Sequence, residues 1–388
     1  MSRQKTYYEN IAVVGEEEWL WSANFNALYK RDRSAGKIEK VGDFTSSCKT
    51  AAYSKIVVYK KKIIGLPFAA DQIFVYDLEE SRFRYVDIGI QGIETKSGHL
   101  NKFYGVVTRE NLLYMIGCNT AYILVFDMEK ESVEDYIDLY PYAEDKEVAD
   151  KGYMREGILY KNTLLAPAAY ENFIFEIDLN DLHVTKRRIE KHGKGFSAIH
   201  ELDGQIWLLP YDEGDIIVWD IAAGKKTVHC VDRFFSFVQG KRNFLSAAAR
   251  NKRVWIFPIV GSAVLSYDCE TGTFSNQNDI NVFFESLKKT PKFVAADIKG
   301  NEITLLTAEI HENVIFDMEK GKMRLAECDI SAVDLLEILD QKDEKLVSET
   351  EFSLSDYLDF VSLRKGTQTV SGKKCCGKDI LNVLLKQL

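Results

Sequence analysis

The sequence predicts an all-β protein, a seven-bladed β-propeller of four-stranded blades with a short C-terminal helical tail. Two observations predict the ring: a motif recurs every 42 to 51 residues, and every repeat has an aromatic residue at one fixed position. A period in the forties is typical of a propeller blade. A change of pattern after residue 329 predicts the tail.

The recurring motif is a short apolar run closed by an aspartate. The aspartates are Asp32, Asp77, Asp127, Asp178, Asp220, Asp268 and Asp317. Ten residues before most of them (eleven for Asp178), an apolar segment ends in proline or a small residue: Ser22, Pro67, Gly117, Pro167, Pro210, Pro258 and Thr307. These landmarks predict the ends of the third and second strands of each blade. We expect the aspartates to cap turns, as aspartate does after a strand.

The aromatic position provides an independent test of the repeat, because it was not used to align the units. Fourteen residues before each proline or small residue lies one of Tyr8, Tyr53, Phe103, Tyr153, Phe196, Phe244 and Phe293. We expect these rings to begin the first strand of each blade and to fill the wedge between blades. In the fifth unit the four strands are predicted at 196–201, 205–209, 215–219 and 226–231, with Asp203-Gly204 as a hairpin turn.

Two domains follow from the change of pattern: residues 1–329 form the propeller and residues 330–388 the helical tail. The tail has apolar residues at helical spacing, for example Val333, Leu336 and Leu339. Blade one has its four strands in chain order from Tyr8, so we expect no strand exchange at ring closure. The tail is expected either to pack on the ring or to dock a partner.

Composition limits the function classes. The chain has 388 residues, a formal net charge of −9 and a pI of about 5.4, which argues against a nucleic-acid partner. The N-terminus lacks an apolar signal region, and no stretch is long enough for a membrane helix. Seven scattered cysteines fit reduced thiols, so we expect a cytoplasmic protein with no membrane contact. No phosphate-loop, dinucleotide, hydrolase or zinc motif occurs, and we expect no cofactor and no metal.

The repeat pattern resembles that of kelch-like propellers, over roughly residues 6–329. The paired glycines that usually follow the second strand of a kelch repeat are missing here. Trp219-Asp220 is similar to the dipeptide of WD40 repeats, but it occurs once and without the Gly-His half of that signature. The kelch resemblance implies either a binding scaffold or an enzyme, because that class contains both, including sugar-acid epimerases.

The segments that join one blade to the next are basic although the protein is acidic. Residues 186–197 carry five cationic side chains against one carboxylate. These segments should emerge on one face, together with loops between the second and third strands that carry Asp71, Tyr170 and Asp212. A basic collar there would attract anions. The predicted ligand-binding residues are Lys49, Asn101, Lys151, Arg155, Lys194, Arg242, Lys289 and Lys292.

Two functional hypotheses remain open. We favour a recognition module that binds a partner protein or an anionic or sugar-like ligand at this basic mouth. The alternative is a carbohydrate- or peptide-modifying enzyme of epimerase, isomerase or lyase type, with acid-base candidates His99, His192 and Tyr153 at the same mouth. His200, inside a predicted strand, is expected to be a packing histidine. The sequence does not predict the oligomeric state.

Overall fold

The structure is a computed structural model of the whole chain. It describes residues 4–5, 8–22, 26–32, 38–45, 52–89, 102–144, 154–190, 193–260, 263–287, 291–307, 313–326 and 329–330. Residues 5–329 form one compact unit, and residues 1–4 with 330–388 form another. The predicted helical tail lies outside the described residues. Among the described residues, no helix has the length and apolarity needed to cross a membrane.

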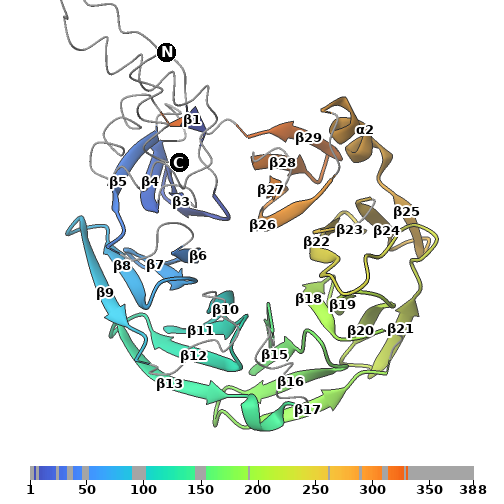
Figure 1. The fold of residues 1–388 in the computed structure, drawn as a ribbon, viewed down its shortest axis with the longest axis horizontal. Helices are drawn as coiled ribbons and strands as arrows, with labels where there is room; N and C mark the ends of the chain where they lie inside the picture. The colour runs from blue at the N-terminus through green and yellow to red at the C-terminus, as the bar shows by residue number, and fades with distance from the viewer. Residues whose placement is uncertain are drawn as a thin grey trace, which may run out of the picture. The chain divides into compact units, whose positions relative to one another are not determined.

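Seven four-stranded antiparallel sheets form a ring, as the repeat predicts (Figure 1). Blade one contains β2 (Ile11–Val14), β3 (Glu17–Ser22), β4 (Ala27–Asp32) and β5 (Ile38–Asp43); blade two contains β6 (Tyr53–Tyr59), β7 (Lys62–Pro67), β8 (Gln72–Asp77) and β9 (Arg82–Asp87). Blade three contains β10 (Phe103–Arg109), β11 (Leu112–Gly117), β12 (Tyr122–Asp127) and β13 (Ser132–Asp138); blade four contains β14 (Ile158–Tyr160), β15 (Thr163–Pro167), β16 (Phe173–Asp178) and β17 (Val184–Arg188).

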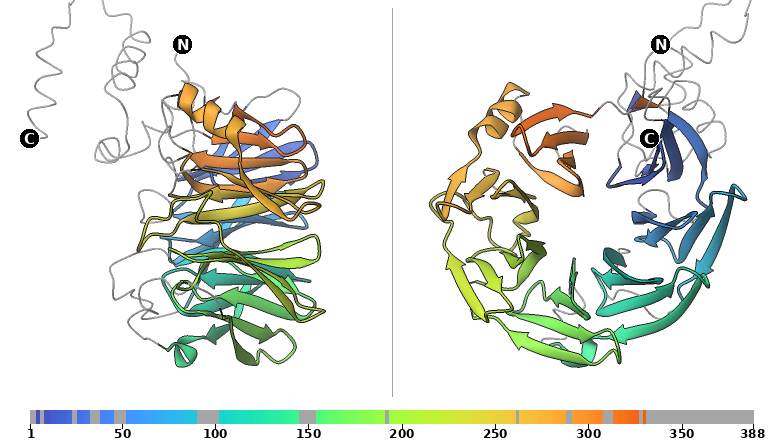
Figure 2. Two further views of the ribbon diagram at one scale, coloured as in Figure 1. Left: turned by 90° about the vertical axis from the view of Figure 1, so that its right-hand side faces the viewer. Right: turned by 180° about the vertical axis from the view of Figure 1, so that it is seen from behind.

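The remaining blades follow the same order. Blade five contains β18 (Phe196–Leu202), β19 (Gln205–Pro210), β20 (Ile216–Asp220) and β21 (Lys225–His229); blade six contains β22 (Phe244–Arg250), β23 (Arg253–Pro258), β24 (Leu265–Asp268) and β25 (Thr273–Asn276). Blade seven contains β26 (Phe293–Lys299), β27 (Glu302–Thr307), β28 (Asn313–Asp317) and β29 (Lys322–Leu325). The short strands β1 (Gln4–Lys5) and β30 (Asp329–Ile330) pair as a separate two-stranded sheet. The right-hand view of Figure 2 shows the blades arranged around a central axis.

The repeated aromatic residues fill the contacts between blades. Six of the seven are described, and all six are at most 1% exposed. Phe244, for example, packs with Trp207 of blade five and Ile256 of blade six. Such burial of large rings supplies much of the apolar driving force for closing the ring. The expectation for these positions is therefore confirmed, apart from Tyr153, which lies outside the described residues.

The landmark aspartates cap turns, as expected. Oδ1 of Asp127 accepts hydrogen bonds from the backbone N–H groups of Glu129 and Lys130, at 2.8 and 3.0 Å. Asp77, Asp268 and Asp317 accept the same pair of bonds. The predicted Asp203-Gly204 turn has positive φ at both residues, as a type I′ hairpin requires.

Side chains join blade seven to blade one. The backbone N–H of Ile11 donates to Oδ2 of Asp297 at 3.0 Å, and the Asn313 side-chain amide donates to the Tyr8 carbonyl at 2.7 Å. Blade one consists of four strands consecutive in the chain. The expected closure without strand exchange is confirmed.

Two short helices lie in connections between blades: α2 (Asn278–Ser286) before blade seven, and a 3-10 helix at Tyr140–Tyr142. The repeat pattern predicts a loop in the connection before blade seven, and the structure contains α2 there instead. The helix is amphipathic, because Ile280 and Phe284 lie one turn apart and are both 1% exposed. They pack with Phe293, the aromatic residue that begins blade seven.

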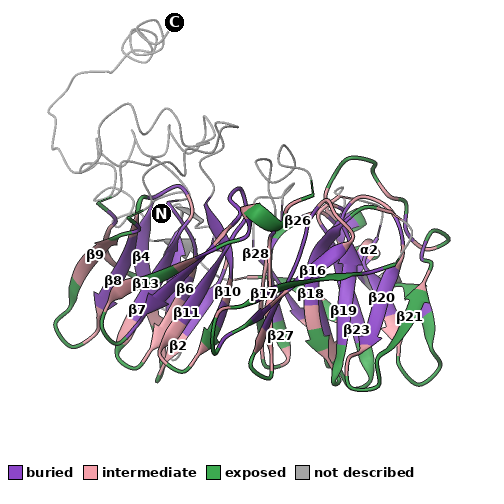
Figure 3. Cartoon of the chain, turned by 90° about the horizontal axis from the view of Figure 1, so that it is seen from below, coloured by how far each residue is buried: buried purple, intermediate pink, exposed green. Residues whose placement is uncertain are grey.

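The ring has two different faces. The hairpin turns after the first and third strands emerge on one side, which we call the hairpin face; their exposed residues line the lower edge of Figure 3. The loops after the second strand and the connections between blades emerge on the opposite side, the loop face. Inner strands therefore begin at the loop face and run toward the hairpin face.

Candidate functional site at the centre of the ring

The structure describes four of the predicted site residues: Arg155, Lys194, Arg242 and Lys292. The other seven, Lys49, His99, Asn101, Lys151, Tyr153, His192 and Lys289, lie outside the described residues. Lys194 is exposed, and Lys292 is partly buried next to the aromatic Phe293. Arg155 and Arg242 are partly buried and lie near one another, as described next.

Arg242 precedes inner strand β22, and hydrogen bonds to strand carbonyls fix the direction of its side chain. One Nη2 atom donates to the carbonyls of Ser197 and Leu245, at 3.0 and 3.2 Å. Burial lowers the pKa of Arg242, and the positive charge of Arg155 lowers it further. The Nε atoms of both arginines are buried without a hydrogen-bond partner. Within the described part of the chain, neither arginine forms an ion pair with a carboxylate.

Gly105 allows the backbone that carries Arg155 to approach inner strand β10. A Cβ at this glycine would lie 2.6 Å from the Arg155 carbonyl oxygen and 2.8 Å from Cα of Glu156. Gly105 also sits at a β-bulge, where the pairing of β10 with β11 shifts register between Phe103 and Gly105. Bulges change the direction of neighbouring side chains. The missing Cβ at Gly105 therefore lets the backbone of Arg155 lie against β10.

His200, in the middle of β18, lies close to the arginines. Its Nε2 accepts the backbone N–H of Ala247 at 3.0 Å and lies 3.9 Å from Oε2 of Glu156. Burial lowers the pKa of His200, against the opposing charge of Glu156. The imidazole is therefore neutral near pH 7 and carries its proton on Nδ1. One ring nitrogen is satisfied, as expected for a packing histidine, but its position beside the arginines was missed.

Glu9, Lys55 and Tyr104 complete the group. Burial raises the pKa of Glu9 to about 8 while the charge of Lys55 opposes the shift, and Oε2 of Glu9 is buried without a partner. The Lys55 ammonium lies 5.0 Å from the centre of the Tyr104 ring. Burial raises the pKa of the Tyr104 phenol, so it remains a hydrogen-bond donor at neutral pH.

We call these seven residues the central cluster: Glu9, Lys55, Tyr104, Arg155, Glu156, His200 and Arg242. They come from blades one to six and affect each other's pKa values across the ring; the charge of Lys55 in blade two lowers the pKa of His200 in blade five. Below pH 8 Glu9 is mostly protonated, which leaves three cationic side chains against the single carboxylate of Glu156. The cluster is therefore cationic near neutral pH.

Neighbouring loop-face residues differ from the arginines because they are already paired. The Lys102 ammonium lies 3.0 Å from Oδ1 of Asp71 and donates to the carbonyls of Ala69 and Ala70. Two tyrosines from adjacent loops, Tyr170 and Tyr211, share a hydroxyl hydrogen bond of 2.8 Å. These groups hold the loops together, whereas Arg155 and Arg242 form no ion pair with a carboxylate of the described residues.

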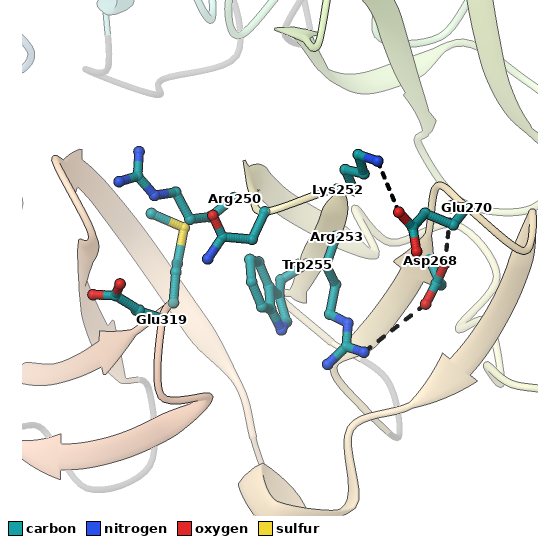
Figure 4. A pocket seen from close by; sticks show the side chains of 9 residues that line it. Arg250, Lys252, Arg253, Trp255, Asp268, Glu270 and Glu319 are labelled. Atoms are coloured by element: carbon teal, nitrogen blue, oxygen red, sulfur yellow. Dashed lines mark hydrogen bonds and ion pairs between the residues drawn. The ribbon is translucent and has the colours of Figure 1, made fainter.

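A separate hollow of about 210 Å³ lies on the hairpin face between blades six and seven, beside Trp255 and Glu319 (Figure 4). Two ion pairs lie in its walls: Lys252 with Glu270 at 2.7 Å, and Arg253 with Asp268 at 4.0 Å. As for metals, the described residues contain no group of three or more histidine, cysteine, aspartate and glutamate side chains arranged to hold an ion.

Comparisons with known proteins show the fold alone. No family model and no curated protein matches the chain. Similar solved structures include a catalytically inactive virginiamycin B lyase from Staphylococcus aureus with quinupristin, at 12% identity and TM-score 0.57, covering 79% of this chain and 93% of that one. The computationally designed Ika8 protein is 12% identical at TM-score 0.54, over 84% of this chain and 88% of that one.

Hydrazine synthase from Kuenenia stuttgartiensis is also 12% identical, at TM-score 0.54, over 85% of this chain and 98% of that one. A lyase, a designed protein and a synthase thus share this architecture at the same low identity. The chain is a seven-bladed β-propeller, and its function has to be argued from its own residues.

Proposed function

We propose that this protein is a ligand-binding propeller that holds a small organic anion between Arg155 and Arg242. One observation carries the proposal: two neighbouring guanidinium groups lie partly buried, each with a buried Nε that lacks a partner and neither with a carboxylate counter-ion in the described chain. Unpaired charges of like sign are costly in such a place. A bound carboxylate or phosphate would satisfy both groups with charge-assisted hydrogen bonds.

The rest of the cluster suits a small ligand better than a broad protein surface. Glu9 in its protonated form and the Tyr104 phenol are hydrogen-bond donors, and both lie within electrostatic range of the arginines or of each other. These groups converge from blades one to six on the centre of the ring. A partner protein would meet a rim, whereas a small anion reaches the centre.

A thermal-shift screen with inorganic phosphate, citrate, glucuronate, glucose 6-phosphate and octanoate tests the proposal. We expect at least one anion to stabilise the protein, and Arg155→Gln to weaken its binding about 10- to 100-fold, the value of one or two charge-assisted bonds. Arg253→Gln on the hairpin face is the matched control and should leave affinity unchanged. Equal losses in both variants, or no loss in Arg155→Gln, would contradict the proposal.

A second candidate is an enzyme of the lyase or epimerase type that uses the same centre. The observation in its favour is a neutral imidazole, His200, beside the Glu156 carboxylate and near arginines that could stabilise developing negative charge. The Ala247 N–H occupies Nε2, the basic nitrogen, and for this reason we rank binding above catalysis.

Turnover measurements separate the two functions once a ligand is known. Catalysis by His200 predicts that His200→Gln abolishes turnover while ligand affinity changes little. Full activity in a His99→Ala/His192→Ala double variant would exclude those two histidines as the acid and base. If the wild-type protein binds a stabilising ligand but does not convert it, the enzyme hypothesis would be excluded for that ligand and the binding function would remain.

A further inference from the structure

Below the central cluster, the centre of the ring contains a cavity. The cavity has a volume of about 500 Å³ and is lined by the inner strands of blades three to seven. Its walls combine the polar residues Thr108, His200 and Glu201 with an aliphatic set: Val106, Ile158, Leu159, Leu202, Ala248 and Ile298. A volume of this size is typical of small-molecule sites, which are mostly apolar with a few fixed polar groups.

Blade seven exposes unusually large aliphatic side chains on this inner strand. Ile298 is 42% exposed and Val294 is 43% exposed. Ile298 lines the cavity, whereas Val294 lies at the β-bulge between Phe293 and Ala295, where regular strand alternation does not apply. Aliphatic surface left in contact with water costs free energy, which an apolar ligand would recover.

The chain segments that carry or contact the arginines also line the cavity. Arg155 and Glu156 directly precede Gly157 and Ile158, which line the cavity. Arg242 bonds to the carbonyl of Ser197, and three residues further along β18 His200 also lines the cavity. At about 3.3 Å per residue, this separation is about 10 Å. One molecule of moderate length can therefore contact both regions.

We propose that the ligand is an amphipathic monoanion, a carboxylic acid with a single alkyl tail. Its carboxylate lies between Arg155 and Arg242, and its tail extends along the inner strands toward Ile298. The inference rests on the proposed anion site and adds the class of ligand. Glu156 limits the excess positive charge of the cluster, which favours one negative charge on the ligand over two or three.

A chain-length series tests this ligand class. Calorimetric titration of the full-length protein with butanoate, hexanoate, octanoate and decanoate, below their micelle concentrations, should show affinity rising up to about fourfold per added methylene, the ratio for burying about 0.8 kcal/mol each. Ile298→Asp should remove this dependence on chain length but preserve the affinity for butanoate. Ile298→Ala should weaken the dependence on chain length without removing it. Val282→Asp, on α2 and 59% exposed, is the matched control and should behave as wild type.

The outcomes distinguish this inference from the proposed function. Equal affinity along the series would overturn the amphipathic ligand but retain an anion site. A dependence on chain length that persists in both Ile298 variants would overturn the placement of the tail. Failure of every carboxylate to bind, together with failure of the phosphate and citrate probes, would contradict the anion site itself. Circular dichroism verifies that each variant is folded.

Discussion

Charged residues on the hairpin face and in the central cluster are arranged in opposite ways. On the hairpin face several form ion pairs, such as Lys252 with Glu270 at 2.7 Å and Lys62 with Glu131 at 2.7 Å. At the centre, Arg155 and Arg242 lie near each other, and each has a buried Nε without a partner. Opposite charges are thus paired at several places on the hairpin face, whereas two like charges lie together at the centre.

Under the proposed function, this difference marks the region where the molecule gives up stability for ligand binding. Exposed ion pairs contribute little, and their loss is tolerated. Neighbouring buried cations reduce stability, and groups with shifted pKa values cluster at functional sites. If the comparison is correct, substitutions at the centre should change ligand binding and the pH dependence of stability, while those on the hairpin face should change stability alone.

Glu9 gives the largest expected effect. Its pKa is raised from 4.5 to about 8 by burial, so the folded state holds the proton more tightly than the unfolded state. The stability that this provides is full below pH 4.5 and is lost as the pH rises through 8. We expect the wild-type free energy of unfolding to fall by on the order of 3 kcal/mol between about pH 5 and 9 because of this group.

Urea denaturation across this pH range checks the effect. Glu9→Gln should make the unfolding free energy nearly independent of pH in this window, apart from other titrating groups. Glu110→Gln, in an exposed turn on the hairpin face, should retain the wild-type slope. Identical slopes in Glu9→Gln and wild type would show that Glu9 ionises normally and does not belong to a buried cluster.

Gly105 gives the next largest effect. The added Cβ of Gly105→Ala meets the backbone of Arg155 and Glu156, which side-chain rotation cannot relieve, and we expect a loss of about 1–3 kcal/mol. Because the contact displaces Arg155, anion affinity should fall as well. Gly204→Ala, in a hairpin turn with φ of +73° and open space around it, should lower stability without changing affinity. Unchanged affinity in Gly105→Ala would separate Arg155 from the site.

The smallest effect is expected at a turn aspartate. Asp220 Oδ1 accepts the Ala223 N–H at 2.9 Å, and Asp220→Ala should cost about 1 kcal/mol, the value of one such bond. Affinity for the anion should equal that of wild type, as measured by calorimetry. A weakened affinity would mean that hairpin-face turns communicate with the centre, and the contrast between the two regions would not hold.

The repeat made most of the fold predictable from sequence, because its landmarks depend on local chemistry: the buried aromatic residue, the strand-ending proline and the turn aspartate. The predicted strands of blade five differ from β18–β21 by at most two residues at any end. The helix α2 was missed because its apolar pair, Ile280 and Phe284, lies in a connection whose length varies between blades.

The site was only partly predictable. The alignment of the repeats predicts that Arg155 and Arg242 lie near the basic mouth of the ring. In the structure the two arginines lie close enough for the charge of Arg155 to lower the pKa of Arg242. Glu9 and Tyr104 were missed, although both directly follow the repeated aromatic residue, and that shared position was a signal. Tyr104 lies at the β-bulge between Phe103 and Gly105, which residue spacing alone does not reveal.

The most direct test follows the unfolding temperature of wild type and Arg155→Gln as octanoate is added. Without the anion, the variant should be the more stable protein. It lacks the repulsion between the two arginines, and it also lacks the buried Nε of Arg155 that has no partner. With saturating octanoate, the wild type should be the more stable, so the two curves cross. A variant that is less stable from the start and parallels wild type throughout would mean that Arg155 is a structural residue, and would contradict an anion site at the centre of the ring.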